Sequence, residues 1–381
     1  MAPFPMHPSR RLVLQAATAT AAGIALPGRT QTGADAIRIG RTSALSGPLS
    51  YPYIEMTNGI VAAFFEANAQ GGINNRKLEL LNLDDQGDPA KAGENTRKLI
   101  EDSNVLAFLG CGPTQSIMAM LPLLAQHKVP LIAPGTGLDA LRAQFNPLIV
   151  YTRPTYGAEI VKIAQHLRTL GQNKCALVWS DNVFGKSALA AFEAEAAKNK
   201  NTEWKGFMFS DKMEDSSKLI DEIAAWEPTA LVSAAVAFKG VLFFKALRSK
   251  VRVPAYTFSL VGSKSILDAL GEQGRGFNVT QVVPNPDSLT IPVVKDYRAA
   301  LKKSRAGTPN YSSLEGYIGA RVLIEGLRRS RGDTDREQFL RSFLTMRPYD
   351  MGGFDVAYSP GDYTGSHFVE LTYYNGDRFR R

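Results

Sequence analysis

Two short segments carry hydroxyl groups and glycines directly after apolar runs that are typical of buried β-strands. The first reads Cys-Gly-Pro-Thr-Gln-Ser over residues 111–116, and the second reads Pro-Gly-Thr-Gly over residues 134–137. In open α/β sheets, ligands bind beyond the carboxyl ends of the strands, where loops lead into helices. Main-chain amides at such a helix start, together with the hydroxyls of Thr114, Ser116 and Thr136, could receive a carboxylate. The same groups could also serve only as helix caps.

The segments around these loops alternate between short apolar runs and longer amphipathic stretches. Residues 37–40 form a β-like run, residues 56–69 place apolar side chains on one helical face, and residues 78–83 form the next run. Asp88 followed by Pro89 then marks a helix start, because Asp caps free amides and Pro is tolerated at the first helical position. This alternation predicts an α/β protein with parallel sheets.

The chain is long enough for two lobes, because its 381 residues exceed the length at which a single hydrophobic core usually stops growing. A second series of α and β segments begins with a helix over 158–170. After the proline-rich segment 283–286, a helix over 311–328 indicates a return to the first lobe. Repeated crossing between the lobes would form a hinge. We therefore predict two doubly wound parallel-sheet lobes, an N-terminal lobe of residues 37–151 and 285–345 and a C-terminal lobe of residues 152–284 and 346–381.

Residues 1–36 have the features of a secretory signal peptide. Arg10 and Arg11 precede an uncharged, alanine-rich stretch that ends at Leu26, and polar residues then lead to a small-x-small exit at 34–36. The paired arginines resemble a twin-arginine export signal, and the apolar stretch is shorter than the ~20 residues that span a bilayer. No later segment resembles a transmembrane helix. We therefore expect export to the periplasm and cleavage of the signal.

Composition and motifs argue against several other classes of protein. The formal charge is +8, but the cations are scattered and no nucleic-acid-binding module is present. Cys111 and Cys175 cannot build a four-cysteine metal site, and the histidines lack metal-ligand spacing. Asp84 and Asp85 are neighbours at a strand end and would point to opposite faces, which argues against joint acid–base work. There is no phosphate loop or dinucleotide fingerprint. We therefore expect a protein that is not an enzyme, binds no nucleic acid, and carries no metal or cofactor.

A set of motifs after the signal carries a specific resemblance. The motifs are Ala-Leu-Ser-Gly-Pro at 44–48, Asn58-Gly59, the Gly-Gly-Ile-Asn-Asn segment within 67–78, and Asp-Asp-Gln-Gly-Asp-Pro at 84–89, in this order. The chain resembles the Leu/Ile/Val-binding type of periplasmic solute-binding protein of ABC importers, and the likeness covers nearly all of it after the signal.

The resemblance implies the type I periplasmic binding fold, in which two lobes are joined by a three-strand hinge and close on a ligand by hinge bending. It further implies a monomer that captures a small ligand and delivers it to an inner-membrane ABC permease with its ATPase. A ligand-sensing protein that docks to a membrane receptor would have the same fold and remains an alternative.

In the resembled family, the loops at 111–116 and 134–137 hold the α-carboxylate of the ligand. Members that bind amino acids also place an acidic residue in the loop that corresponds to 259–262, where this chain reads Ser-Leu-Val-Gly. Burying an unpaired ammonium costs several kcal/mol. The ligand class therefore stays open between a branched-chain amino acid-like molecule, an amide, and an aromatic or aliphatic carboxylate.

Three other acids could supply the missing charge, namely Asp181, Asp139 and Glu55. Aromatic side chains could form the walls of the site, although ordinary packing would explain each of them equally well; they are Tyr51, Tyr53, Tyr156, Phe184 and Phe238. The candidate ligand-binding residues are thus Tyr51, Tyr53, Thr114, Ser116, Gly135, Thr136, Asp181 and Phe184.

Overall fold

A computed structural model describes residues 36–380 except 48, 211–215, 236–237, 262, 345 and 347. The predicted signal peptide therefore lies outside the described residues, apart from its last position. The side chain of Phe238 also lies outside them.

The first lobe is built on a parallel sheet with the strand order β2-β1-β3-β4-β5. Its strands are β1 (Ile37–Ser43), β2 (Leu78–Asp84), β3 (Ala107–Leu109), β4 (Leu131–Ile132) and β5 (Ile149–Val150). Its helices are α1 (Ser50–Ala69), α2 (Pro89–Glu101), α3 (Thr114–His127), the short η1 (Asp139–Leu141), α9 (Pro292–Ser304), α10 (Tyr311–Arg329) and α11 (Arg336–Leu344).

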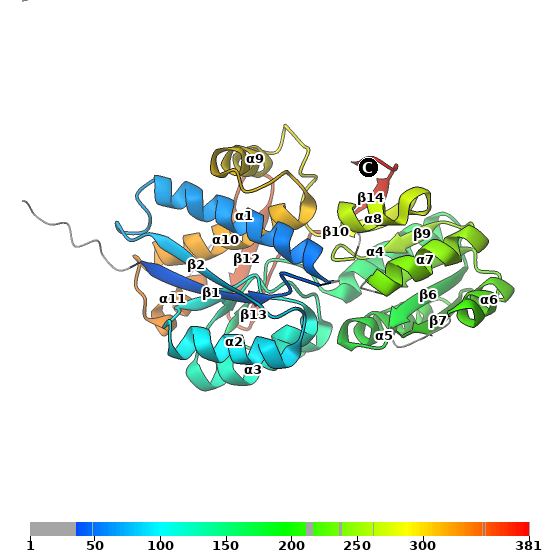
Figure 1. The fold of residues 1–381 in the computed structure, drawn as a ribbon, viewed down its shortest axis with the longest axis horizontal. Coiled ribbons are helices and arrows are strands. Elements are labelled where there is room, and N and C mark those ends of the chain that lie inside the picture. Colours follow the sequence, from blue (N-terminus) through cyan, green and yellow to red (C-terminus); the bar gives the residue numbers. More distant parts are fainter. Residues whose placement is uncertain are drawn as a thin grey trace, which may run out of the picture. The chain divides into compact units, whose positions relative to one another are not determined.

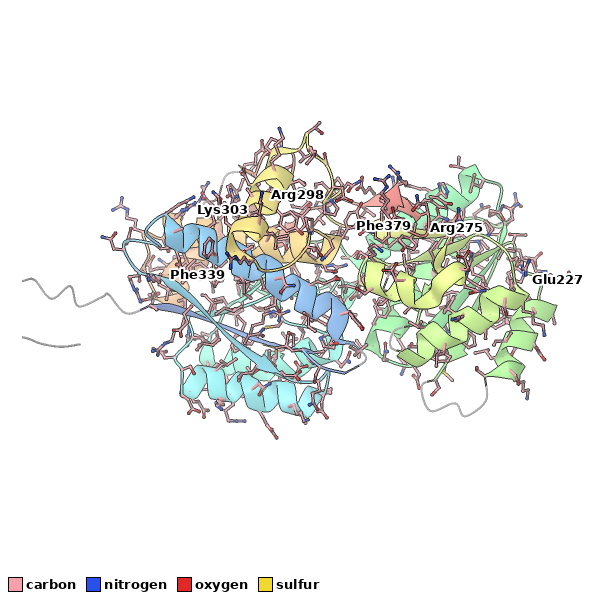
Figure 2. The ribbon with its side chains drawn as sticks, turned by 45° about the horizontal axis from the view of Figure 1, so that its top comes forward. Glu227, Arg275, Arg298, Lys303, Phe339 and Phe379 are labelled. Carbon is pink, nitrogen blue, oxygen red and sulfur yellow. The ribbon has the colours of Figure 1, made fainter. Side chains whose placement is uncertain are left out.

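Helices cover both faces of this sheet. On one face, Ile39 packs with α1 and α10, which lie side by side, and Phe339 of α11 joins the same buried cluster (Figures 1 and 2). On the other face, Phe108 packs with Ile117 of α3 and Leu99 of α2. The sheet is therefore the central layer of a three-layer lobe, as the alternating pattern predicts.

The contact between α1 and α10 depends on two glycines. A Cβ atom on Gly59 would lie 1.7 Å from the carbonyl oxygen of Ser313, and one on Gly316 would lie 2.1 Å from that of Met56. Any side chain at either position would separate the two backbones. The Asn58-Gly59 motif is therefore a packing feature that fixes the position of α1 on the lobe.

The second lobe has a sheet with the order β15-β14-β10-β9-β8-β6-β7, parallel from β10 to β7 and antiparallel at β14 and β15. The strands are β6 (Lys174–Ser180), β7 (Glu203–Phe209), β8 (Ala230–Ala234), β9 (Ala255–Thr257), β10 (Phe277–Gln281), β14 (Glu370–Tyr374) and β15 (Phe379–Arg380). The helices are α4 (Tyr156–Thr169), α5 (Val183–Ala197), α6 (Ser217–Ala225), α7 (Phe238–Lys250), α8 (Lys264–Leu270) and the short η2 (Gly271–Gly274). Helices α4 and α5 pack on one face, and α6, α7 and α8 pack on the other.

The segment after α11 is divided between the two lobes. A small antiparallel sheet of β11 (Tyr349–Asp350), β12 (Asp355–Ser359) and β13 (Asp362–Gly365) packs through Val356, Tyr358 and Tyr363 into the core of the first lobe. Of the strands described in this segment, β14 and β15 join the second sheet. Phe379 of β15, labelled in Figure 2, packs against Tyr311 of α10. We therefore propose that the first lobe extends to residue 365 rather than ending at 345.

Several local expectations are confirmed. Asp88 caps α2 by accepting hydrogen bonds from the amides of Ala90 and Lys91, and Pro89 is the first helical residue. Asp84 and Asp85 diverge, because Asp84 is exposed whereas Asp85 is buried.

Candidate functional site

A cleft lies where the carboxyl ends of both sheets meet the starts of their helices, and its empty space, including the open mouth, is about 540 Å³. The first lobe contributes the starts of α1 and α3, and the second contributes α4, the start of α5 and the segment around α8. The lining residues are Leu49, Pro52, Tyr53, Pro113, Thr114, Gln115, Tyr156, Asn182, Phe184, Leu260, Val261 and Ile266. None of these described lining residues carries a charge, so the cleft is apolar with a few hydroxyl and amide groups.

A cluster of buried hydroxyls lies at the base of this cleft. The Thr114 Oγ1 atom lies 2.9 Å from Thr136 Oγ1 and 3.3 Å from the Tyr156 hydroxyl. The Thr136 and Tyr156 oxygens are 3.4 Å apart. All three side chains are almost fully buried. The cluster thus joins the two predicted loops of the first lobe to the first residue of α4 in the second.

Tyr53 lines the cleft from the first lobe. It lies on α1 and is 5% exposed. Its ring packs over two glycines, since a Cβ on Gly112 would lie 2.3 Å from Cε1 of the ring and one on Gly135 would lie 3.2 Å from it. Its hydroxyl has no hydrogen-bond partner in the described part of the chain, and burial raises its pKa, so the phenol keeps its proton at neutral pH.

The start of α3 faces the same space as Tyr53 and Thr114. Pro113 precedes the helix, and no side chain caps its first turn. The amides of a first turn have no partner within their own helix, and the helix dipole gives them partial positive charge. This end of the cleft therefore offers hydrogen-bond donors.

Two aromatic rings, Phe184 and Tyr156, line the opposite wall, and the fully buried Phe258 packs against both. The ring centroid of Phe184 lies 4.8 Å from that of Tyr156 and 5.4 Å from that of Phe258, with edge-to-face geometry in both pairs. Phe184 belongs to the first turn of α5, which Asn182 caps by accepting from the Gly185 amide. These contacts fix Phe184 as a rigid apolar surface at the cleft.

The other predicted ligand-binding residues lie beside the cleft lining. Ser116 is buried next to Asp85, and Thr136 lies behind Thr114 in the hydroxyl cluster. Gly135 supports the Tyr53 ring, and its amide donates to the carbonyl of Cys111 at 2.8 Å. Tyr51, although only two residues from Tyr53, is 57% exposed. Asp181 is half exposed and pairs with Lys186 at 2.8 Å.

The remaining acids that could face an ammonium are also occupied elsewhere. The carboxylate of Asp139 accepts from the Gly157 amide at 3.1 Å. Glu55 accepts from Ser265 at 3.3 Å and lines a separate, polar cavity with Lys264 and Arg378. Burial raises the pKa of Glu55, whereas its hydrogen bonds with serines lower it. Neither carboxylate lines the apolar cleft.

Sequence reasoning missed a buried ion cluster behind the cleft. Arg153 is fully buried and contacts Glu159 of α4 at 3.0 Å and Glu315 of α10 at 3.1 Å. The Arg153 guanidinium also donates to Ser259 Oγ at 2.6 Å, and the Ser259 amide donates to Glu159 at 2.9 Å. Ser259, the first residue of the loop in which the resemblance places an acid in amino-acid binders, is therefore part of this cluster.

The electrostatics of the cluster follow from its burial. Burial disfavours the charge on Arg153, but the two nearby carboxylates outweigh it and raise the pKa of the guanidinium. Burial raises the pKa of Glu315, and Arg153 opposes that shift. Since Arg153 follows β5, Glu159 lies in the second lobe and Glu315 in the first, the cluster ties both lobes to a crossover segment.

Within the described ranges, no helix combines the length and the apolar character that crossing a membrane requires.

Comparisons with known proteins agree with this architecture. A sequence model of the family described as periplasmic binding protein matches residues 36–377. The chain is similar to the Leu/Ile/Val-binding protein homolog 7 of Brucella suis biovar 1 (strain 1330), with 25% identity over 327 residues that cover 81% of this chain and 80% of the relative. Its fold is similar to that of a possible leucine/isoleucine/valine-binding protein from Rhodopirellula baltica SH 1, with a TM-score of 0.86, 24% identity and coverage of 92% and 97%.

A further solved structure of the same fold is an ABC transporter solute-binding protein from R. palustris in complex with benzoate. Its TM-score is 0.80 at 18% identity, with coverage of 91% of this chain and 95% of that chain. Because the family model spans nearly all of the described residues and both lobes have the expected sheets, the chain belongs to the periplasmic binding protein family, whose members bind solutes outside the cytoplasm.

Proposed function

We propose that this chain is an extracytoplasmic solute-binding protein that captures a small ligand in the apolar cleft and delivers it to an ABC importer. The observation that carries the proposal is the uncharged cleft between the two lobes, with donors at one end and rigid aromatic rings at the other. Family membership supports solute binding. Delivery of the ligand to a permease and its ATPase is proposed in addition to it.

The cleft favours a ligand with a compact apolar body. Side chains such as Phe184, Val261 and Ile266 would remove that body from water, and each buried methylene contributes about 0.8 kcal/mol. The names of the relatives span leucine, isoleucine and valine on one side and benzoate on the other. Both kinds of body are small and apolar, which agrees with this lining.

Capture by closure follows from the distribution of the contacts. Tyr53 and Thr114 belong to the first lobe, whereas Phe184 and Val261 belong to the second, so a ligand contacts both only when the lobes are close together. A ligand shifts the balance between open and closed forms by its differential affinity for the closed one. The closed form would then present a two-lobe surface for a permease to recognise.

The proposal includes export. The predicted twin-arginine signal over residues 1–36 would carry the chain to the periplasm, where the signal is cleaved, and the mature protein would act there as a monomer.

Ligand-dependent stabilisation tests the proposal. Residues 37–381 would be unfolded and refolded to strip any bound ligand, and the melting temperature would be measured against branched-chain amino acids, short amides, aromatic carboxylates and apolar acids. Binding to the native state alone raises stability, by about 2.7 kcal/mol at a ligand concentration of 100 Kd.

A cleft-filling variant locates the effect. Val261→Trp places an indole in the cleft lining, whereas Leu289→Trp places the same group at a position that is 66% exposed. We expect Val261→Trp to lose the ligand-induced shift while remaining folded, and Leu289→Trp to keep it. The proposal fails if no compound stabilises the refolded chain, or if both variants respond like the wild type.

A further inference from the structure

We propose that the cleft selects a carboxylate whose body carries no ammonium group, and that the Tyr53 hydroxyl donates a hydrogen bond to this carboxylate. This inference deepens the proposed function and rests on it. It names the ligand class and the residue that distinguishes this cleft.

The charge of the cleft lining restricts the ligand. A buried ammonium needs a carboxylate partner, because an uncompensated buried ion is strongly unfavourable. No described residue that lines the cleft is acidic. Nearby Glu159 and Glu315 are held by Arg153, and Glu159 also accepts from Ser259 and Thr280. An amino acid would therefore bury its ammonium without a partner.

Asp85, the remaining buried acid near the cleft, is also committed. Its carboxylate accepts from the hydroxyl of Thr42 at 3.1 Å and from the amide of Gly87 at 2.8 Å. Burial raises its pKa to about 6, while these hydrogen bonds oppose the shift. The acid points into the loop structure of the first lobe and does not line the cleft.

Hydrogen-bond donors in the lining also restrict the ligand. A ligand that displaces water from a donor must supply an acceptor, because nearly all buried polar groups in native proteins have a hydrogen-bond partner. Tyr53 is 5% exposed, lines the cleft, and has no partner for its hydroxyl among the described residues. Because Tyr53 lines the cleft, its hydroxyl can donate a hydrogen bond to an oxygen of a bound ligand.

The position of the Tyr53 hydroxyl is fixed by packing of its ring. The Tyr53 ring is held between α1 and the backbones of Gly112 and Gly135, where side chains would collide with it. Gly112 lies directly before Pro113 and the start of α3, so the phenol hydroxyl lies close to the uncapped first turn. Tyr53, the Thr114 hydroxyl and the helix start thus form one group of donors.

A group of donors beside a helix N-terminus favours an anion over a neutral amide. A carboxylate accepts at both oxygens, and hydrogen bonds to charged acceptors are stronger than those to neutral ones. An amide would also bring two N–H groups. Two side-chain amides are in the described lining: Asn182 already uses its oxygen to cap α5, and Gln115 donates to the Gly87 carbonyl at 3.3 Å. The apolar rest of the cleft then takes the hydrocarbon body.

Matched ligand series test this selection on the refolded chain. The first series is 4-methylpentanoate, leucine and 4-methylpentanamide, and the second is phenylacetate, phenylglycine and phenylacetamide. Within each series the body stays the same while the ammonium is added or the carboxylate is replaced. We expect the acid of at least one series to bind more than 10-fold more tightly than its amino acid and its amide, measured by isothermal titration.

Tyr53→Phe tests the hydroxyl itself. It removes a hydroxyl that has no hydrogen-bond partner among the described residues, so the melting temperature without ligand should not fall. Affinity for the acid should fall about 10- to 100-fold, as expected for the loss of a hydrogen bond to a charged acceptor. Tyr373→Phe, at a position that is 42% exposed on β14, is the matched control and should leave affinity unchanged.

The outcomes separate this inference from the proposed function. If leucine or phenylglycine binds as tightly as its acid, or an amide does, the selection is wrong while solute binding stands. If the acid binds equally to wild type and Tyr53→Phe, the role of the hydroxyl is wrong. If an amino acid or an amide of the wider panel binds and no ammonium-free acid does, the ligand class is overturned, and if nothing binds at all, both proposals fall.

Discussion

Replacing Arg153 by methionine would test whether the buried ion cluster holds the two lobes to their crossover segment. Met keeps much of the apolar volume of the arginine stem but removes the cation between Glu159 and Glu315. Both carboxylates are almost fully buried, with side-chain exposures of 0% and 10%. The variant therefore leaves two acids next to each other without a counter-charge.

The expected cost is large. Breaking a buried ion pair by removing one partner typically costs 3–5 kcal/mol, because the remaining charge is uncompensated. Native proteins are stable by about 5–15 kcal/mol, so Arg153→Met should lose a large share of the free energy of unfolding. By contrast, Arg38→Met removes an exposed pair with Glu79 at 3.4 Å and should cost about 1 kcal/mol or less.

The deficit should depend on pH in a defined direction. Burial raises the pKa of Glu315, and removing Arg153 takes away the charge that opposes this shift. An acid with a raised pKa in the folded state binds its proton more tightly there than in the unfolded chain. It therefore contributes stability at low pH that is lost as pH rises through the folded pKa. Arg153→Met should thus be closer to wild type at pH 5 than at pH 8.

Urea unfolding at pH 5 and pH 8, followed by circular dichroism, would measure these differences. Adding Glu315→Gln to Arg153→Met should recover part of the lost stability, since it removes one of the unpaired charges. A loss below about 1 kcal/mol for Arg153→Met, matching the Arg38→Met control, would refute this reasoning. So would a deficit that is the same at both pH values.

Two further predictions concern the scaffold that positions the cleft. Gly59→Ala should lower the free energy of unfolding by about 3 kcal/mol or more, because its Cβ would collide with the backbone of Ser313. Gly93→Ala on α2 is the control, since its Cβ meets no atom within 4 Å and the change should be neutral or stabilising. Thermal melts of both variants would check this. Asp88→Ala should lower the free energy of unfolding by about 1 kcal/mol through loss of the α2 cap, and a urea midpoint unchanged from wild type would contradict it.

Much of the fold could be predicted because its signals are local. Apolar periodicity over short windows located the strands near 37–40 and 78–83, and Asp88-Pro89 marked the start of α2. The two loops of the first lobe followed from the rule that ligands lie beyond the carboxyl ends of parallel strands. That rule selects loops, but it does not select which side chain of a loop faces the ligand. Thr114 lines the cleft, whereas Ser116, two residues later, is fully buried and does not line it.

The difference between Tyr51 and Tyr53 illustrates a second limit. The predicted helix begins at Met56, but α1 begins at Ser50, so both tyrosines are helical. Two residues in a helix turn the chain by about 200°, which sends one ring into the cleft and the other into solvent. Because the predicted helix starts at Met56 instead of Ser50, helical geometry could not be used to separate Tyr51 from Tyr53.

Long-range clusters were not accessible from sequence patterns. Arg153, Glu159, Ser259 and Glu315 meet only after both lobes fold, and no motif or period connects them. The small sheet β11–β13 was missed for a related reason. Its strands are short, and they pack on core residues of the first lobe that lie far away in the sequence.

A crystal structure of the refolded chain with phenylacetate or 4-methylpentanoate would test the ligand site most directly. We predict that the carboxylate lies within hydrogen-bond distance of the Tyr53 hydroxyl and Thr114 Oγ1, with the hydrocarbon body against Phe184 and Val261. A ligand bound instead in the polar cavity beside Glu55 and Lys264, or one whose carboxylate points away from Tyr53, would contradict the proposed capture site.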